Sequence, residues 1–216
     1  YLKQQINPHF LYNTLDMIRL KAAINKDTEV SQMLMKLVSF YRLSTKVYDS
    51  MVAVRKEVEM LDAYMSLMCY RYSDIIYRSE IEPGALDIEL PNFILQPLLE
   101  NSLMHGLKDR RYQGTIILKI YRNEQDKNEL NIWLIDDGIG IPDDKMAELN
   151  AYNAKDSEAL YRVQTRTEGD RTHLGVINVI SRLKLNYQEN AEVIYMRNET
   201  GGTTVKIKIK TASEET

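Results

Sequence analysis

The chain contains three histidines, and each lies in a stretch whose residue types could take part in phosphoryl transfer. His9 lies near the amino end, His105 lies close to Asn101, and His173 lies close to Gly175. At neutral pH much of an ordinary imidazole is neutral, because its pKa is about 6.5, and its free ring nitrogen can attack phosphorus. A histidine near a helix start, followed far downstream by a candidate nucleotide pocket, predicts an imidazole that accepts a phosphoryl group.

A lone helical histidine is more often a surface or packing residue than a nucleophile, so the case for His9 depends on downstream motifs. In the run LQPLLENSLMHG at residues 95–106, Pro97, Asn101 and His105 follow helical spacing and would share one helix face. Mg²⁺ keeps several waters and takes few protein oxygens beside substrate phosphates, so the Asn101 amide oxygen suits it. Taken alone, Asn101 could equally cap or bridge neighbouring segments.

Two glycine-bearing motifs follow. In DDGIGIP, Asp136 comes at the end of a predicted strand, where it could accept a hydrogen bond from an adenine amino group. Gly138 and Gly140 would let the backbone approach the base without a β-carbon, although the same run is also a plausible turn before a proline. In LGVIN, Gly175 stands at the mouth of a predicted helix, where free amides favour phosphate.

Composition limits the class of protein. The 216 residues, 44% hydrophobic and 27% charged, predict a globular chain with one large domain or a helical segment plus one domain. The net charge of −3 argues against a nucleic-acid surface. The single cysteine, Cys69, cannot form an internal disulfide, as a reducing cytoplasm permits. No run reaches the ~18 apolar residues of a membrane span, and no signal peptide opens the chain. Because the sequence starts at Tyr1 without an initiating methionine, we expect a fragment whose sensor or membrane part lies upstream.

Apolar residues at helical spacing predict three helices in the first third of the chain, and we expect their apolar stripes to be packing surfaces. The first begins at Pro8 with Asn7 as its cap, because proline lacks the amide that would be unpaired there. A helix that enters from upstream and kinks at Pro8 fits equally well. The other two cover residues 30–41 and 54–72.

From about residue 75, short β-like runs alternate with turns. We expect strands at residues 116–121, 130–135, 193–196 and 203–209, and helices at about 91–105 and 174–185. The polar stretch 142–172 predicts a long loop, which in compact domains is usually functional or disordered. We place the boundary near residues 76–80, which divides the chain into a helical region, 1–78, and a second unit, 79–216.

With these motifs in this order, the chain resembles the sensor histidine kinases of the LytS/YesM-like branch, which carry a GHKL-type (Bergerat) ATP-binding domain. The resemblance extends from Gln4 to about Lys210 and rests on QINPHFLYNTL, LQPLLENSLMHG, DDGIGIP and HLGVINV. It implies an α+β fold, in which an antiparallel helical dimerisation region precedes an α/β sandwich with helices on one face of a mixed sheet. Two copies would pair their first helices into a bundle.

The resemblance also implies roles for individual residues. His9 would be the phosphoacceptor, Asn101 the Mg²⁺ ligand and Asp136 the adenine anchor. The other implied nucleotide-binding residues are His105, Gly138, Gly140, Arg171, Gly175 and Val176. The implied cofactors are ATP and Mg²⁺, and the implied partners are a second copy and the receiver domain of a response regulator. The chain would be the cytoplasmic domain of a bacterial plasma-membrane receptor and would meet the membrane only through an upstream segment.

Several positions depart from the family pattern. His173 and Val176 stand where glycine and leucine are usual, which removes backbone freedom near the phosphates. Asp137 replaces the usual asparagine and adds negative charge near the nucleotide. Phe10 follows His9 where many other histidine kinases have an acid, so the general base is unassigned.

Several other residues have both a possible catalytic role and an ordinary structural explanation. Glu100 is a candidate base if the two parts of the chain close, and Asp16 is less favourable because seven helical residues span ~10 Å. Asn13, one turn after the first histidine, could orient a water that dephosphorylates the regulator, or it could serve ordinary packing. Arg166 or Arg171 could neutralise phosphate charge or could be solvated.

The leading hypothesis is ATP-dependent autophosphorylation of His9 and transfer to an aspartate of a response regulator. Two alternatives stay open. One is a dimeric nucleotide-binding scaffold without catalysis, and the other is an ATPase of the same superfamily without a phosphohistidine. The stimulus, the cognate regulator, and whether phosphorylation occurs within or between protomers lie beyond what the sequence indicates.

Overall fold

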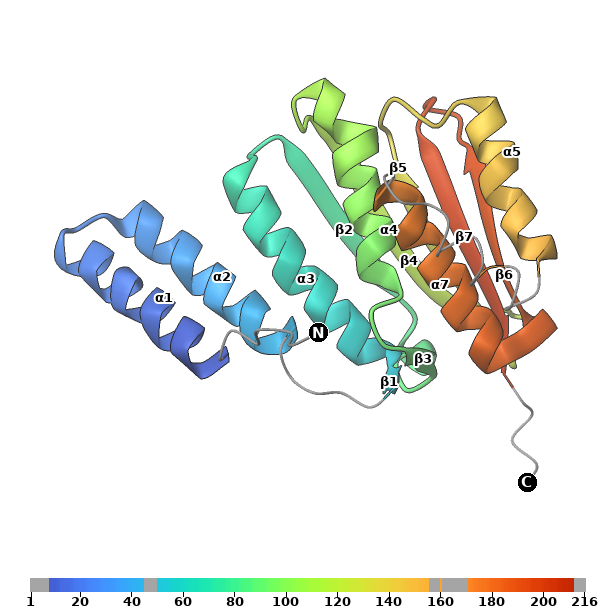
Figure 1. The fold of residues 1–216 in the computed structure, drawn as a ribbon, viewed down its shortest axis with the longest axis horizontal. Coiled ribbons are helices and arrows are strands. Elements are labelled where there is room, and N and C mark those ends of the chain that lie inside the picture. The colour runs from blue at the N-terminus through green and yellow to red at the C-terminus, as the bar shows by residue number, and fades with distance from the viewer. Residues whose placement is uncertain (1–7, 45–49, 156–159, 161–170, 212–216) are drawn as a thin grey trace.

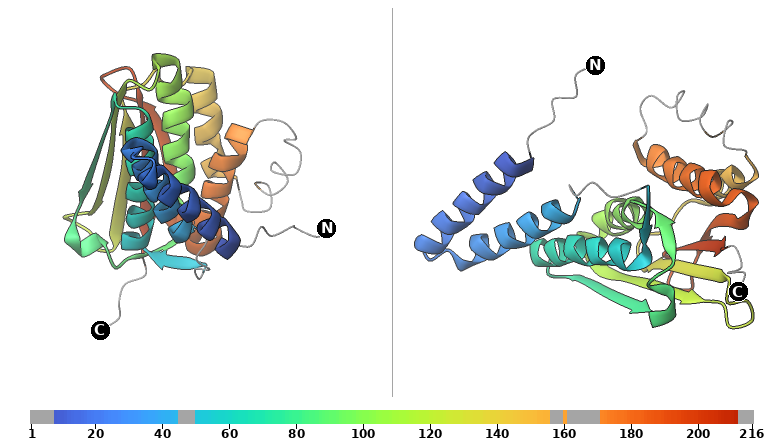
Figure 2. Two further views of the ribbon diagram at one scale, coloured as in Figure 1. Left: turned by 90° about the vertical axis from the view of Figure 1, so that its left-hand side faces the viewer. Right: turned by 90° about the horizontal axis from the view of Figure 1, so that it is seen from below.

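The computed structural model describes residues 8–44, 50–155, 160 and 171–211. Its first two helices, α1 (Pro8–Ile24) and α2 (Thr28–Ser44), form an antiparallel hairpin at one end of the molecule (Figures 1 and 2). The Asp27 carboxylate accepts a hydrogen bond from the Val30 amide (3.1 Å) and caps α2. The predicted helix start after Asp27 is confirmed, and residues from Pro8 onward are helical as expected, whereas the predicted cap Asn7 lies outside the described residues.

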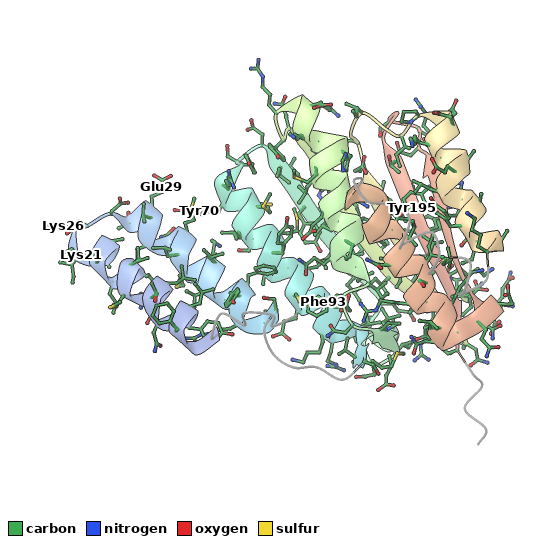
Figure 3. The ribbon with its side chains drawn as sticks, in the orientation of Figure 1. Lys21, Lys26, Glu29, Tyr70, Phe93 and Tyr195 are labelled. Carbon is green, nitrogen blue, oxygen red and sulfur yellow. The ribbon has the colours of Figure 1, made fainter. Side chains whose placement is uncertain are left out.

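The third helix, α3 (Val54–Arg71), lies between the hairpin and the rest of the molecule (Figure 1). Its contacts with α2 are partly polar, since the Tyr70 hydroxyl donates to the Glu29 carbonyl (3.0 Å; Figure 3) and Lys36 donates to the Ser66 hydroxyl (2.7 Å). Its other face is apolar and joins the main core through Val54, Val58, Leu61 and Met65. The division of the chain near residue 78 stays a prediction.

A five-stranded mixed sheet forms the second layer, in the order β2-β4-β5-β7-β6. Only the β2·β4 pair is parallel among these neighbours. The strands are β2 (Ile75–Ile81), β4 (Gly114–Arg122), β5 (Glu129–Asp136), β6 (Ala191–Arg197) and β7 (Thr203–Lys210). Helices cover one face of the sheet (Figure 2), which confirms the predicted α+β sandwich.

Residue alternation explains which face of the sheet is covered. Every second residue of a strand points to the same face, and on the central strands these residues are the buried ones. They are Ile116, Leu118 and Ile120 of β4, Leu130, Ile132 and Leu134 of β5, and Val205, Ile207 and Ile209 of β7. On the opposite face Lys206 lies over the Trp133 ring at 4.0 Å, so this face is amphipathic rather than a second core.

The helix that carries the LQPLLENSLMHG motif starts later than predicted. Residues Glu89–Pro91 form β3, which pairs with β1 (Met51–Ala53), and the backbone then turns at Phe93 with φ 58°. Consequently α4 runs over Leu95–Asn101 rather than from about residue 91. It continues as a π-helical segment, Ser102–Leu107, and a 3₁₀ turn, Lys108–Arg110. The start of α4 is therefore set by the pairing of β3 with β1, a strand far earlier in the sequence.

Part of the predicted 142–172 loop is helical. Helix α5 (Asp143–Ala151) has a polar sequence with Leu149 as its buried residue, so its apolar periodicity is too weak to predict a helix. Two asparagine side chains attach α5 and the 3₁₀ turn after it (Tyr152–Ala154) to the edge strand β6. Asn150 of α5 exchanges two hydrogen bonds with the backbone of Tyr195, and Asn153 of the turn exchanges two with the backbone of Val193. These bonds occupy backbone groups of an edge strand, which protects it from pairing with another chain.

Helix α7 (Arg171–Tyr187) starts three residues earlier than predicted and packs on the same face of the sheet as α4 (Figure 1). Within the described part of the chain, no helix has the length and apolarity needed to cross a membrane.

A buried carboxylate joins α3 to the start of α4. Glu57 is fully buried, and its oxygens accept hydrogen bonds from the amides of Phe93 (2.7 Å), Ile94 (2.9 Å) and Leu95 (3.0 Å). Phe93 is labelled in Figure 3. The first amides of a helix have no partner within the helix, so Glu57 supplies one from another helix. Burial raises the pKa of Glu57, while these three bonds lower it.

We predict that Glu57→Ala lowers the free energy of unfolding by about 3 kcal/mol or more, because it leaves three buried amides without an acceptor. Denaturant unfolding measures the change. Glu59→Ala is the matched control, since Glu59 is exposed and pairs with Lys56, and a surface pair contributes less than about 1 kcal/mol. Equal effects of the two substitutions would contradict the capping role.

Candidate nucleotide-binding site

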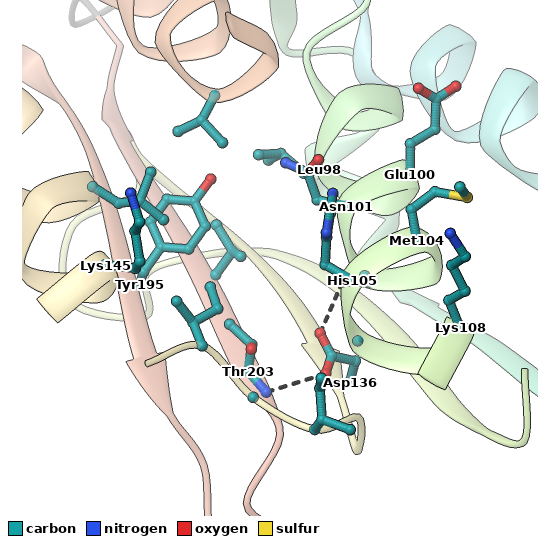
Figure 4. Close-up of a pocket in the computed structure, with 18 of the residues that line it drawn as sticks. Leu98, Glu100, Asn101, Met104, His105, Lys108, Asp136, Lys145, Tyr195 and Thr203 are labelled. Carbon is teal, nitrogen blue, oxygen red and sulfur yellow. Dashed lines mark hydrogen bonds between the residues drawn. The ribbon is translucent and has the colours of Figure 1, made fainter. Parts of the chain in front are cut away.

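A pocket of about 710 Å³ opens between α4, α5, α7 and the ends of strands β5, β6 and β7 (Figure 4). Its walls combine apolar side chains, among them Leu98, Ile139 and Val205, with a few polar groups. This composition is typical of a small-molecule site, where apolar contacts supply affinity and the polar groups fix orientation.

Asp136 lies at the floor of the pocket, at the end of β5, and only 2% of it is exposed. Its Oδ1 accepts hydrogen bonds from the amides of Gly138 (3.0 Å) and Thr203 (3.1 Å), and its Oδ2 accepts one from the Ser102 hydroxyl (2.9 Å; Figure 4). Burial raises the pKa of Asp136, and these three bonds oppose the increase. A carboxylate has about four acceptor positions, so Oδ2 keeps one for a ligand.

Glycines surround this carboxylate because backbone segments approach one another closely. A β-carbon on Gly138 would lie 2.5 Å from the Gly106 carbonyl oxygen, and one on Gly106 would lie 3.1 Å from Asp136 Oδ1. Gly140 has φ 76°, and a β-carbon there would collide with the Gly201 carbonyl. Gly140 lines the pocket, whereas the constraint on Gly138 comes from its contact with the π-helical segment. Their roles toward a nucleotide stay predictions.

The α4 wall brings together three residues singled out from the sequence. Asn101 and His105 point into the pocket, one turn apart, and Glu100 lies at its upper rim (Figure 4). Gln96 orients Glu100 by donating a hydrogen bond to its carboxylate (2.8 Å). His105 lies in the π-helical segment, a backbone form that is rare and often occurs at functional sites.

Asn101 fits the chemistry expected of a Mg²⁺ ligand. Among the described residues there is no group of three or more His, Cys, Asp and Glu that could hold a metal ion by itself. One amide oxygen on a pocket wall is compatible with an ion whose other ligands are waters and substrate phosphates.

The glycine-bearing start of α7 is placed differently from the expectation. Val176 lines the pocket. Because α7 begins at Arg171, Gly175 lies beyond the first four amides of the helix rather than at its mouth. A β-carbon on Gly175 would lie 3.7 Å from Pro97, an ordinary contact, so packing does not require glycine there. A phosphate role for Gly175 stays a prediction.

The structure does not describe the side chains of most remaining candidates. Arg166 lies outside the described residues, as do the side chains of His9, Arg171 and His173. The position of α1 is described, and α2 and α3 lie between it and the α4 wall (Figure 1), so His9 and Asn13 belong to an element away from the pocket.

The negative charge of Asp137 faces β4 rather than the pocket. Its Oδ1 accepts a hydrogen bond from the Thr115 amide (2.8 Å) and lies 3.7 Å from the Arg110 guanidinium. Asp137 is also absent from the lining of the pocket. The extra charge expected from the sequence is therefore directed away from the pocket and paired.

The sequence did not point to six polar residues of the pocket, namely Ser102, Lys108, Asp109, Lys145, Tyr195 and Thr203. Ser102 follows Asn101 within the LQPLLENSLMHG motif, so the sequence could have identified it as a pocket residue. Tyr195 and Thr203 belong to strands more than fifty residues after Asp136, and nothing in their local pattern indicates a pocket.

Comparison with known families agrees with this geometry. The family described as "Histidine kinase-, DNA gyrase B-, and HSP90-like ATPase" matches residues 87–213, which include every residue that lines the pocket. The family described as "Histidine kinase" matches residues 1–76. The chain belongs to the histidine kinase-, DNA gyrase B- and HSP90-like ATPases and, within them, to the histidine kinases.

Similar proteins support the same family. The chain is 33% identical over 173 residues to the sensor protein LytS of Oceanobacillus iheyensis, covering 76% of this chain and 29% of that protein. It is 26% identical to the sensor histidine kinase YpdA of Escherichia coli, covering 96% of this chain and 33% of that protein. The chain thus spans about a third or less of the length of these relatives.

Solved structures support the fold alone. The catalytic domain of the histidine kinase ThkA superposes with a TM-score of 0.51 at 12% identity, over 76% of this chain and 98% of that one. The mycobacterial sensor histidine kinase MprB gives 0.50 at 14% identity, over 76% and 97%.

We predict that Asp136→Asn weakens ATP binding by about 10- to 100-fold, because an amide nitrogen in place of Oδ2 would face the adenine amino group donor to donor. Isothermal titration measures the change. Asp87→Asn is the control, since Asp87 is exposed and pairs with Arg55 away from the pocket.

The pH dependence of binding provides a separate prediction. Under the adenine assignment, the ionised Asp136 is the stronger acceptor, because protonation places a donor on one oxygen and removes the charge, and the pKa of Asp136 lies above the ordinary value of 3.8. The affinity of the wild type for ATP should therefore be constant near neutral pH and fall as the pH decreases through this raised pKa. The affinity of Asp136→Asn should not show this fall. A wild-type decline that the variant reproduces would contradict the assignment.

Proposed function

We propose that this chain is the catalytic part of a two-component sensor kinase, which transfers the γ-phosphoryl group of ATP to His9 and then to an aspartate of a response regulator. The observation that carries the proposal is the Asp136 carboxylate, which is held by three hydrogen bonds at the floor of a pocket whose adjoining α4 wall presents Asn101 and His105. The family-typical QINPHFLYNTL run around His9 supports the acceptor assignment.

In this proposal different pocket residues bind different parts of the nucleotide. Asp136 Oδ2 accepts a hydrogen bond from the adenine amino group, and the apolar walls exclude water from the base. Asn101 would hold Mg²⁺, which supplies charge neutralisation to the phosphates when it is bound. Lys145 also lines the pocket from α5, where its ammonium pairs with Glu148 (3.1 Å). Catalysis in this scheme comes from positioning and electrostatics, with neutral His9 as the nucleophile.

We also propose that the chain acts as a homodimer through α1. Phe10, Met17 and Ile24 are 66%, 65% and 75% exposed and recur every seven residues, with Leu20 beside them. A seven-residue apolar repeat forms one stripe on a helix, and two such stripes can bury each other in a helical bundle. Pairing of two hairpins would also offer His9 the pocket of a second protomer, since α2 and α3 lie between α1 and its own pocket.

The proposed setting is the cytoplasmic side of a bacterial membrane receptor, where ATP and a soluble receiver domain are both available. The names of the relatives, a sensor protein and a sensor histidine kinase, support it.

Autophosphorylation is the direct test. We expect the wild-type chain, incubated with γ-labelled ATP and Mg²⁺, to gain an acid-labile label that His9→Gln abolishes while nucleotide binding is retained. His105→Gln is a useful comparison, because it should reduce labelling through the pocket without removing the acceptor. A label that persists in His9→Gln would contradict the acceptor assignment. Free phosphate without protein label would instead support an ATPase, and binding without either product would support a scaffold.

We predict that replacing both Met17 and Ile24 with lysine shifts the chain from dimer to monomer in sedimentation velocity and lowers labelling wherever transfer occurs between protomers. Ile76→Lys is the matched control, because Ile76 is 49% exposed but lies on β2. An unchanged sedimentation coefficient for the double variant would contradict the α1 interface.

A further inference from the structure

The β6 wall of the pocket contains a buried phenol that the adenine and phosphate assignments do not use. Tyr195 lines the pocket, is 3% exposed, and has no hydrogen-bond partner for its hydroxyl among the described residues. Burying a hydroxyl without a partner costs about 1–3 kcal/mol. Phenylalanine would fill the same space without that cost, so the hydroxyl calls for a partner that enters the pocket.

Two other tyrosines show a paired hydroxyl, although the buried hydroxyl of Tyr77, away from the pocket, also lacks a partner among the described residues. The Tyr187 hydroxyl donates to the Glu89 carbonyl (2.6 Å), and the Tyr152 hydroxyl donates to the Glu148 carboxylate (3.4 Å). Neither residue lines the pocket. What distinguishes Tyr195 from Tyr77 is that Tyr195 lines the pocket, where a bound ligand can supply the missing partner.

Tyr195 is also held firmly in position. The Asn150 side chain donates to the Tyr195 carbonyl (2.9 Å) and accepts a hydrogen bond from its amide (2.8 Å). These bonds attach β6 to α5 at the residue whose ring enters the pocket. Burial raises the pKa of Tyr195, so the phenol stays neutral and can both donate and accept.

The sheet register indicates which part of a nucleotide the hydroxyl would meet. Thr203, whose amide binds Asp136, marks the adenine end, and Tyr195 pairs with Val205, two residues further along β7. Two residues of a strand span about 7 Å. That distance is comparable to the width of a purine, so Tyr195 lies beyond the base edge that Asp136 would bind. Its hydroxyl points away from Asp136 (Figure 4).

We propose that the Tyr195 hydroxyl hydrogen-bonds a ribose hydroxyl of the bound nucleoside triphosphate and thereby makes the pocket select ribonucleotides over deoxyribonucleotides. The proposal rests on the proposed ATP-binding function. The sugar is the part of the nucleotide between the base held by Asp136 and the phosphates at Asn101. A sugar hydroxyl would complete the hydrogen bonding of the phenol at the moment of binding, so the contact adds affinity and specificity together.

The test compares ATP, 2′-deoxy-ATP, 3′-deoxy-ATP and 2′,3′-dideoxy-ATP binding to the full 216-residue chain with and without Tyr195→Phe, by isothermal titration. The phenyl ring keeps the packing and removes the hydroxyl. We expect Tyr195→Phe to weaken ATP binding about three- to tenfold and to leave dideoxy-ATP binding unchanged. The wild type should therefore prefer ATP over at least one deoxy form, and the variant should lose that preference. Tyr187→Phe, which removes a hydroxyl away from the pocket, should change neither.

The outcomes separate the two proposals. If the wild type binds ATP and Tyr195→Phe binds every nucleotide as tightly as the wild type does, the ribose contact is wrong and the kinase function stands. If Tyr195→Phe weakens ATP and dideoxy-ATP equally, the hydroxyl meets another group and the ribose assignment is again wrong. If the wild type binds no adenine nucleotide, the proposed function fails and the ribose contact fails with it. Thermal unfolding of both variants checks that a lost affinity does not come from a lost fold.

Discussion

The pocket depends on one buried carboxylate. Asp136 ends β5, and its partners come from the following loop (Gly138), from the start of β7 (Thr203) and from the π-helical segment (Ser102). A buried carboxylate without such donors would take up a proton instead of staying charged. The same bonds therefore hold three separate segments together and keep an acceptor ready at the pocket floor. Close backbone approaches beside it require glycine at Gly106, which lies against Asp136, and at Gly138, which lies against Gly106.

Glu57 is a second buried carboxylate stabilised by hydrogen bonds, but it has a different role. It is also a buried carboxylate that binds backbone amides, but its three partners all belong to the start of α4, and it does not line the pocket. Asp136 shares its acceptor positions between the protein and the pocket. Burial raises the pKa of both acids, so their pKa values do not distinguish them. They differ in that Asp136 lines the pocket and keeps an acceptor position for a ligand, whereas Glu57 does not line the pocket. Glu57 fixes the helix that carries Asn101 and His105, and so it positions the site from outside.

The two parts of the chain have different surfaces. The helical hairpin leaves an apolar stripe on α1 exposed, whereas the sheet and its helices bury theirs around the pocket. With α2 and α3 between them, α1 and the pocket of the same chain are apart in this arrangement (Figure 1). A phosphoryl transfer to His9 requires an approach of the two parts or a second protomer. The proposed bundle of hairpins addresses the second possibility, since it would bring two copies of α1 and two pockets into one assembly.

Much of the fold and part of the site could be predicted because the signals are local. Apolar spacing indicated α1, α2, α3 and α7, alternation indicated β4 to β7, and short motifs pointed to Asp136, Asn101 and His105. These patterns report which face of a helix or strand is buried, which neighbouring residues alone determine. The start of α4 at Leu95, the helix α5, the direction of the Asp137 side chain and the entry of Tyr195 into the pocket were decided only by tertiary structure. Each of them depends on a hydrogen bond, a strand pairing or a packing contact between segments far apart in the chain, and no local pattern encodes such a contact.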